Sequence, residues 1–334
     1  MAHNRRDQRA GNKCVVLVTN RVLYGLPFVP RKSVKQVLLG ILAKAQNLYH
    51  VEICGFVFMG NHYHMVLKSK ACKLSPFMNY ANGEIAKAFR RLTGRYRGKF
   101  WQGRYKEQKL ATPIDVLRAL AYIYSNPTRA GLVSHPKDYP GLISYNLYQV
   151  QAHWTKPSKL KKLQNEYSTK TDEIDYLHIR KNFTASYVLR IKPFAWVRCF
   201  KERCDRSLLE KMLEEQLNVN FERFLGGEKL INQPLDKHWE PKSKGKTPFI
   251  ICHDEELRKI LIADYRAFVA ECRKAWELFK QGYQVTFPGG CYSPPQTSRS
   301  PHRVTNIYQC WQWSGNKRLK TKPISYLLAD EVPK

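Results

Sequence analysis

Acidic residues are scarce in this chain of 334 residues: 27 Asp and Glu stand against 57 Lys and Arg, a formal net charge of +30. Residues 1–150 hold 24 basic and 6 acidic residues, and the remainder holds 33 and 21. An excess of this size favours a polyanionic partner, because lysine and arginine that neutralise phosphates release condensed counterions. The alternative is a solvated basic surface on a protein with an unrelated role.

Long apolar runs are also missing. No stretch reaches the roughly 18 consecutive apolar residues that would span a bilayer. The first thirteen residues, MAHNRRDQRAGNK, are polar and do not resemble a signal peptide. We therefore predict a cytoplasmic protein that is nucleoid-associated when bound to DNA.

The nine cysteines contain no C-x-x-C pair, and their number is odd. A disulfide framework or a thiolate zinc site is therefore not indicated. Cys14, Cys54 and Cys252 stand beside aliphatic residues, where a reduced thiol serves as a small hydrophobic side chain. We interpret the cysteines as ordinary reduced thiols.

Hydrophobic periodicity in the first 150 residues alternates between strand and helix patterns. The order of strand, helix, hairpin, helix, strand and helix predicts an α+β fold. We expect a mainly antiparallel sheet with helices on one face and a site on the other. The expected elements are a strand at 14–21, a helical stripe over 33–48, a hairpin of 50–59 with 62–68, a helix from Ser75-Pro76 to Leu92, and a helix from about Pro113 that stops at Pro127.

The composition changes after residue 150. Residues 154–173 are polar and charged, which is typical of a linker, and amphipathic helical segments follow near 206–220 and 254–281. We predict a catalytic domain at 1–150 and a mostly helical accessory extension at 151–334. The pattern assigns no chemistry to that extension.

Two histidines, His62 and His64, lie within an otherwise apolar strand pattern. Alternation on a strand places them on one face with Val66, while Tyr63, Met65 and Leu67 point to the other. Two neutral imidazoles on an open face are able to share a divalent ion. The alternative is a pair of hydrogen-bonded polar side chains, so a third ligand is needed to support a metal site.

Three other histidine patterns fit poorly. A histidine-triad nucleotide hydrolase needs a third histidine where this chain has Val66. A two-histidine phosphoesterase needs Thr or Ser at the position of His64 and a second copy of the motif. A structural zinc site needs four closely spaced ligands, and the neighbouring sequence supplies no further Cys or His.

A later segment, AYIYSNPTRAGLV at 121–133, offers the missing groups. Tyr122 and Asn126 are four apart near the end of the expected helix, so they share one face. Asn126 would complete a three-ligand site, and Tyr122 would point at a phosphate. Tyr124 lies about 200° around the helix from Asn126 and should face elsewhere. A tyrosine that only packs in the core is the alternative for Tyr122.

Together, MGNHYHMVL, FWQGRYKE and AYIYSNPTRAGLV resemble the HUH-superfamily single-tyrosine transposases, most closely the REP-associated tyrosine transposases. The resemblance covers roughly residues 12 to 150 and includes DYPGLISY at 138–145. It implies a ferredoxin-like palm, with Tyr122 as nucleophile. His62, His64 and Asn126 would bind Mg²⁺ or Mn²⁺.

Two positions depart from the family pattern. Gly60 stands where many members carry proline, and Tyr63 is the hydrophobic residue between the histidines, which places a second tyrosine near the site. Neither departure removes a catalytic group.

The resemblance implies an enzyme that cleaves and rejoins single-stranded or hairpin DNA through a 5′-phosphotyrosine, without a small-molecule organic cofactor. We expect a monomer rather than a homodimer. Arginines interleaved with aromatic residues are suited to stacking unpaired bases and following phosphates. The predicted DNA-binding residues are Arg90, Arg91, Arg95, Arg97, Lys99, Trp101, Arg104 and Lys106. The alternative function is that of a domesticated DNA- or RNA-binding protein that does not use its chemistry.

Overall fold

The computed structural model describes residues 13–94, 98–163, 185–200, 205–225, 248–283, 285–288 and 305–306. The chain divides into two compact units. The larger comprises Lys13–Ser69 and Lys73–His253, and the smaller includes Asp254–Lys334. Both histidines and the tyrosine singled out in the sequence belong to the larger unit.

The elements up to Arg129 follow the predicted order. They are β1 (Lys13–Arg21), α1 (Lys32–Tyr49), β2 (Glu52–Phe58), β3 (His62–Lys70), α2 (Ala71–Leu92), β4 (Lys106–Leu110) and α3 (Pro113–Arg129). Two expected boundaries are wrong: α2 begins before Pro76, and α3 continues past Pro127. A proline near a helix end removes at most one backbone hydrogen bond, so the helix tolerates it there.

Six strands form the main sheet in the order β5-β2-β3-β1-β4-β8. β2 and β3 form the predicted antiparallel hairpin, in which Val57 pairs with His64 and Phe58 with Tyr63. β1 pairs antiparallel with β4, β2 pairs antiparallel with β5 (Leu142–Ile143), and β4 pairs parallel with β8 (Ile250–Ile251). The α+β class and the mainly antiparallel sheet are therefore confirmed.

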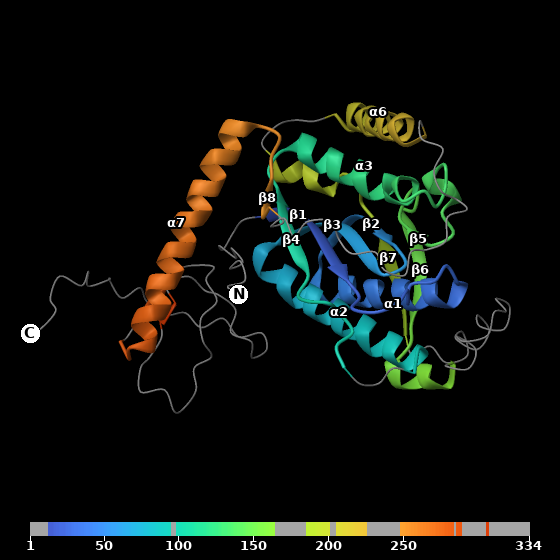
Figure 1. The fold of residues 1–334 in the computed structure, drawn as a ribbon, viewed down its shortest axis with the longest axis horizontal. Helices are drawn as coiled ribbons and strands as arrows, with labels where there is room; N and C mark the ends of the chain where they lie inside the picture. Colours follow the sequence, from blue (N-terminus) through green and yellow to red (C-terminus); the bar gives the residue numbers. More distant parts are fainter. Residues whose placement is uncertain are drawn as a thin grey trace, which may run out of the picture. The chain divides into compact units, whose positions relative to one another are not determined.

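Helices cover both faces of this sheet, which corrects the expectation of helices on one face only (Figure 1). On one face, Tyr63, Met65 and Leu67 of β3 share a core with apolar residues of α1 and α2. On the other face, Val66 shares a second core with α3 and with α6 (Arg206–Leu225). The candidate site therefore lies beneath a helix rather than on an open sheet surface.

Gly55 of β2 allows α3 to approach the sheet closely. A Cβ atom at this position would lie 2.9 Å from the Tyr124 hydroxyl, 3.0 Å from Ile123 Cδ1 and 3.0 Å from Leu120 Cδ2. The β2–β3 register also shifts between Ile53 and Gly55. The absent side chain at residue 55 thus sets the depth at which α3, and with it Tyr122, rests on the sheet.

The described segments after residue 129 complete the larger unit. They are η1 (Pro136–Asp138), β5, β6 (Gln149–Trp154), η2 (Pro157–Leu163), β7 (Ala185–Arg190), η3 (Ala195–Cys199), α6 and β8. β6 and β7 pair antiparallel, and Ala152 and Leu189 are buried in the core that contains α1. Trp196 of η3 is buried in the other core.

These contacts differ from the boundary expected at residue 150 and from the linker expected at 154–173. The residues from Gln149 to Leu163 form β6 and η2, while 164–173 lie outside the described residues. The division into compact units falls between His253 and Asp254. The polar composition of this segment predicts a linker, but apolar positions scattered among its charges, such as Leu160, are buried in the core.

The smaller unit is built on α7 (Glu255–Lys280). Its buried residues Phe268, Cys272 and Ala275 pack with Phe287 of β9 (Thr286–Phe287), which pairs parallel with β10 (Thr305–Asn306). Together with α6, this helix confirms the expected helical C-terminal region. Across the described ranges, no helix is both long enough and apolar enough to cross a membrane.

Candidate active site

His62 and His64 lie at the start of β3 on the face that α3 covers. The alternation predicted from the sequence is confirmed, since Val66 belongs to the α3 core whereas Met65 and Leu67 belong to the opposite core. The two imidazole rings are 5.2 Å apart between centroids. Strand geometry alone therefore brings two metal-competent side chains together.

Tyr63 is directed away from this site. Its ring is fully buried in the α1–α2 core, and its hydroxyl donates a hydrogen bond of 2.7 Å to Oδ1 of Asn82. The second tyrosine that the sequence places between the histidines is thus a structural residue.

Each histidine is held through its Nδ1 atom. His62 Nδ1 lies 2.9 Å from Oδ1 of Asn61, and His64 Nδ1 lies 2.9 Å from Oγ1 of Thr19 on β1. An amide oxygen only accepts, so the first contact assigns the proton of His62 to Nδ1 and leaves Nε2 with its lone pair. Such a partner on the remote nitrogen is typical of a histidine whose Nε2 binds a metal.

Both imidazoles are neutral at physiological pH. Burial, followed by the charge of Arg21, lowers the pKa of His62 from 6.5 to about 4. Burial, followed by the charges of His62 and Arg129, lowers the pKa of His64 from 6.5 to about 3. Metal binding requires neutral imidazole, so this environment keeps the pair ready to act as ligands.

α3 brings Tyr122 to the histidines. The rings of Tyr122 and His64 meet edge to face, with centroids 5.3 Å apart. The helix start is fixed by a capping box in which Thr112 and Asp115 each bind the other's backbone N–H. At the other end, the guanidinium carbon of Arg129 lies 4.8 Å from the centroid of the Tyr122 ring. A cationic group therefore lies beside the candidate nucleophile.

Tyr124 faces elsewhere, as predicted. Its ring packs edge to face against Tyr145 at 5.5 Å, and its hydroxyl lies next to Gly55. The side chain is 4% exposed, whereas Tyr122 is only half-buried. Burial also raises the pKa of the Tyr124 hydroxyl, which disfavours the phenolate needed for attack. Tyr122 is the better candidate of the two.

Asn126 lies one turn after Tyr122 and is half-buried. Two neutral imidazoles and an amide oxygen form a donor set for a divalent ion: the amide oxygen suits Mg²⁺ or Mn²⁺, whereas imidazole is more typical of transition-metal ions. In the described part of the chain, no three His, Cys, Asp or Glu side chains form a group that could hold a metal. Asn126 as the third ligand stays a prediction from the sequence.

The rim of the site is formed by the end of β1 and the loop before β4. Val22 N donates to Asn61 O at 2.8 Å, and Gln102 N donates to Arg21 O at 2.8 Å. This loop therefore lies beside the strand end next to His62.

The predicted DNA-binding residues have different placements. Lys99, Arg104 and Lys106 are exposed, and Arg90 donates a hydrogen bond to the backbone oxygen of Gly98. Arg91 is half-buried in the last turn of α2. Arg95 and Arg97 lie outside the described residues.

Trp101 is half-buried and packs against the core. Its ring packs against Phe28 and Tyr63, at centroid distances of 6.2 Å and 5.6 Å, and its Nε1 donates to the backbone oxygen of Asn82 at 3.0 Å. Aromatic contacts to the core occupy part of this indole, and its role in DNA binding stays a prediction.

Three residues of the site were missed in the sequence. Asn61 precedes the histidine pair directly, and Arg129 follows Tyr122 by seven residues, a helical spacing that places both on one face. The sequence positions of Asn61 and Arg129 could therefore have indicated their place in the site. Thr19 had no such signal, because its contact with His64 depends on strand pairing between distant segments.

Comparisons with known proteins show a family similarity over part of the chain. Residues 18–126 match the family described as "Transposase IS200 like". A solved structure of the REP-associated tyrosine transposase bound to a REP hairpin is 19% identical, with a TM-score of 0.37, and the match covers 44% of this chain and 84% of that chain. No curated protein matches the sequence. The family match confirms the resemblance found in the sequence motifs.

Proposed function

Because residues 18–126 belong to the IS200-like transposase family, we propose that they form a metal-dependent endonuclease and transposase domain that cleaves and rejoins single-stranded, hairpin-forming DNA. The observation that supports this best is the edge-to-face contact of 5.3 Å between Tyr122 and His64. It joins two separately predicted halves of a site, one on β3 and the other on α3.

In this proposal Tyr122 is the nucleophile. Its oxygen, after losing the hydroxyl proton, attacks the phosphorus of a phosphodiester and forms a new P–O bond. The bond from phosphorus to the 3′ oxygen breaks, and that oxygen takes up a proton to become a free 3′-OH. The 5′-phosphotyrosine conserves the bond energy, so attack by a 3′-OH reseals a strand without a high-energy cofactor.

His62, His64 and Asn126 would hold the divalent ion, which would polarise the phosphodiester and stabilise its negative charge. Asn61 and Thr19 orient the two imidazoles through their Nδ1 atoms. Arg129, beside the Tyr122 ring, is placed to attract phosphate oxygens.

The partner in this proposal is single-stranded or hairpin DNA, which matches the net charge of +30. A cytoplasmic location near the nucleoid and a monomeric state stay predictions. The accessory role of the residues beyond 150 likewise stays a prediction, because the family match ends at residue 126.

The test is covalent trapping on hairpin DNA with single-stranded flanks. The protein is incubated with Mn²⁺ and DNA that carries a label at either its 3′ or its 5′ end, then resolved on a denaturing gel. A 5′-phosphotyrosine retains the 3′ label on the protein and releases the 5′ label on a fragment ending in 3′-OH. Wild type should give this pattern, and Tyr122→Phe should give no adduct.

Tyr148→Phe is the matched control, since Tyr148 is 57% exposed and should form adduct as wild type does. Equal adduct from Tyr122→Phe would exclude Tyr122 as the nucleophile. An absence of adduct across a library of hairpins, with retained DNA affinity, would instead favour the binding-only function.

A further inference from the structure

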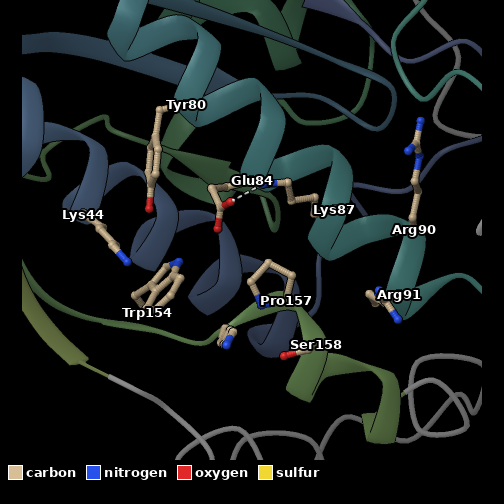
Figure 2. Close-up of a pocket in the computed structure, with 10 residues that line it drawn as sticks. Lys44, Tyr80, Glu84, Lys87, Arg90, Arg91, Trp154, Pro157 and Ser158 are labelled. Atoms are coloured by element: carbon tan, nitrogen blue, oxygen red, sulfur yellow. Dashed lines mark hydrogen bonds and ion pairs between the residues drawn. The ribbon is translucent and has the colours of Figure 1, made fainter. Parts of the chain in front are cut away.

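A cavity of about 530 Å³ lies between α1, α2 and the segment that follows β6. Figure 2 shows side chains of α2 facing Trp154 and Pro157 across it. Tyr80 and Trp154 both pack against the α1–α2 core, whereas Tyr122 packs against the α3 core. The cavity is therefore on the opposite face of the sheet from the candidate active site.

α2 contributes one complete helical stripe to the cavity. Tyr80, Glu84, Lys87 and Arg91 follow one another at spacings of four, three and four, which places them on one face. The core stripe of α2 is a different one, made of Phe77, Ala81, Ile85, Ala88 and Phe89. The charged members of the cavity-lining stripe, Glu84, Lys87 and Arg91, therefore lie outside the apolar core stripe of the helix.

The cavity carries a large excess of positive charge. Its lining includes five cationic side chains and one carboxylate, that of Glu84. Lys87 Nζ already lies 3.0 Å from Glu84 Oε1, so this carboxylate is paired within the cavity. The cationic lining residues are Lys44, Lys87, Arg90, Arg91 and Lys156. Such a lining suits an anionic ligand, and phosphate is an anion that lysine and arginine clusters bind well.

The cavity also has aromatic side chains in its lining, Tyr80 and Trp154, which its ligand would contact. Lys44 Nζ lies 3.1 Å from the centroid of the Trp154 ring, a cation–π contact that holds the indole at the cavity. The Trp154 Nε1 atom is buried and has no hydrogen-bond partner among the described residues. The backbone at Trp154 packs closely against α1, since a Cβ on Gly40 of that helix would lie only 2.9 Å from Trp154 Cα. A planar ligand able to contact an indole fits this arrangement.

We propose that this cavity binds one unpaired nucleotide of a DNA strand, with the base against Trp154 or Tyr80 and the flanking phosphates against Lys87, Arg91 and Lys156. The volume suits a single nucleotide rather than a duplex, because small-molecule sites occupy about 300–1,000 Å³. Arg90, which lines the cavity, donates a hydrogen bond to the backbone oxygen of Gly98, so the exposed Lys99 follows directly beside it. That continuity favours a nucleotide within a strand over a free one.

This inference rests on the proposed function for its choice of DNA, but its site and its test are separate. Trp154 to Ser158 lie outside the matched family segment, which ends at residue 126. Binding is measured in EDTA by fluorescence anisotropy, so that cleavage chemistry does not contribute. The probes are hairpins with single-stranded flanks in which unpaired thymidines are replaced one at a time by 5-iododeoxyuridine.

Irradiation should crosslink one flank position to Trp154 or Tyr80, identified by peptide mass spectrometry. Trp154→Leu should weaken binding about fivefold or more, since one stacked base is worth about 1–3 kcal/mol, while Trp154→Phe should restore most of the affinity. Arg91→Gln should reduce the slope of log K against log salt by about 0.7, the value for one phosphate contact on a single strand. Arg273→Gln, at an exposed position of α7, is the matched charge control and should change neither.

Crosslinks confined to other residues, with affinities of the Trp154 and Arg91 variants within twofold of wild type, would overturn the proposal. A second result would also overturn it: saturation-transfer NMR shows deoxyadenosine monophosphate bound to wild type but not to Trp154→Leu, while the two proteins have the same hairpin affinity. The site would then bind a free nucleotide. Thermal melting checks that each variant is folded, and the exposed Lys156→Gln provides a second variant at low structural risk. Crosslinking to the cavity without any Tyr122 adduct would refute the proposed catalysis but not the nucleotide site. Adduct formation without crosslinking to the cavity would refute the nucleotide site but not the proposed catalysis.

Discussion

The hydrogen bond between Thr19 and His64 should control metal affinity without controlling the fold. Thr19→Val keeps the shape of the side chain but replaces the Oγ1 atom, 2.9 Å from His64 Nδ1, with a methyl group. The imidazole then loses the partner that fixes its orientation. Loss of such an outer partner usually lowers metal affinity about 10- to 100-fold, which corresponds to roughly 1.4–2.7 kcal/mol at about 1.36 kcal/mol per tenfold change.

The assay is titration of the protein with Mn²⁺, with the unbound ion followed by its electron paramagnetic resonance signal. Thr19→Ser should retain affinity close to wild type, because it keeps the hydroxyl. Thr128→Val is a matched control: the Thr128 hydroxyl is buried and has no hydrogen-bond partner among the described residues. Its removal should leave metal affinity unchanged and should not lower stability.

Equal Mn²⁺ affinity in wild type and Thr19→Val would refute the reasoning, provided that His64→Ala abolishes binding. It would mean that packing beneath α3 alone orients the imidazole. A loss of affinity in Thr128→Val as large as in Thr19→Val would also refute it, because the effect would then be general to buried threonine hydroxyls.

Two further predictions concern stability. Gly55→Ala should lower the free energy of unfolding, measured in urea, by about 1–3 kcal/mol through overpacking, because its Cβ would meet α3 side chains at 2.9–3.0 Å. Gly83→Ala is the control: its Cβ would have no atom within 4 Å, so the change should stabilise α2 by about 0.5–1 kcal/mol. Equal effects of the two substitutions would show that α3 yields easily at Gly55. In the folded protein the pKa values of His62 and His64 are low, about 4 and about 3. Below pH 6.5 the unfolded chain therefore binds more protons than the folded one, so the free energy of unfolding in EDTA should fall as pH drops from 6.5 toward 4. The double variant His62→Gln, His64→Gln should show a shallower fall in its urea midpoint over that window, and an unchanged slope would contradict the assigned burial.

The histidine half of the site was predictable from the sequence because strand alternation is strict. The run from His62 to Leu67 fixes which side chains share a face once it is read as a strand, and the cores on both sides confirm that reading. The spacing of Tyr122 and Asn126 is a similarly local property of a helix. Local periodicity therefore identified the candidate residues.

The position of α3 was not predictable in this way. Periodicity shows that a helix has an apolar face, but the choice of sheet face depends on the chain connection and on the close approach at Gly55. The contacts of Thr19 and Trp101 depend likewise on pairing between distant strands and loops. These are tertiary effects, for which a single sequence carries little signal.

Helix α1 has a consequence for how the chain can be shortened. Its residues from Val37 to Ala43 are buried without interruption, so apolar and small side chains are covered around the whole helix. The sheet and α2 cover one side, and β6 with β7 covers the side that carries Gly40. A fragment that ended near residue 150 would leave that second side open to water and prone to self-association, whereas a fragment that ended at His253 would retain its cover.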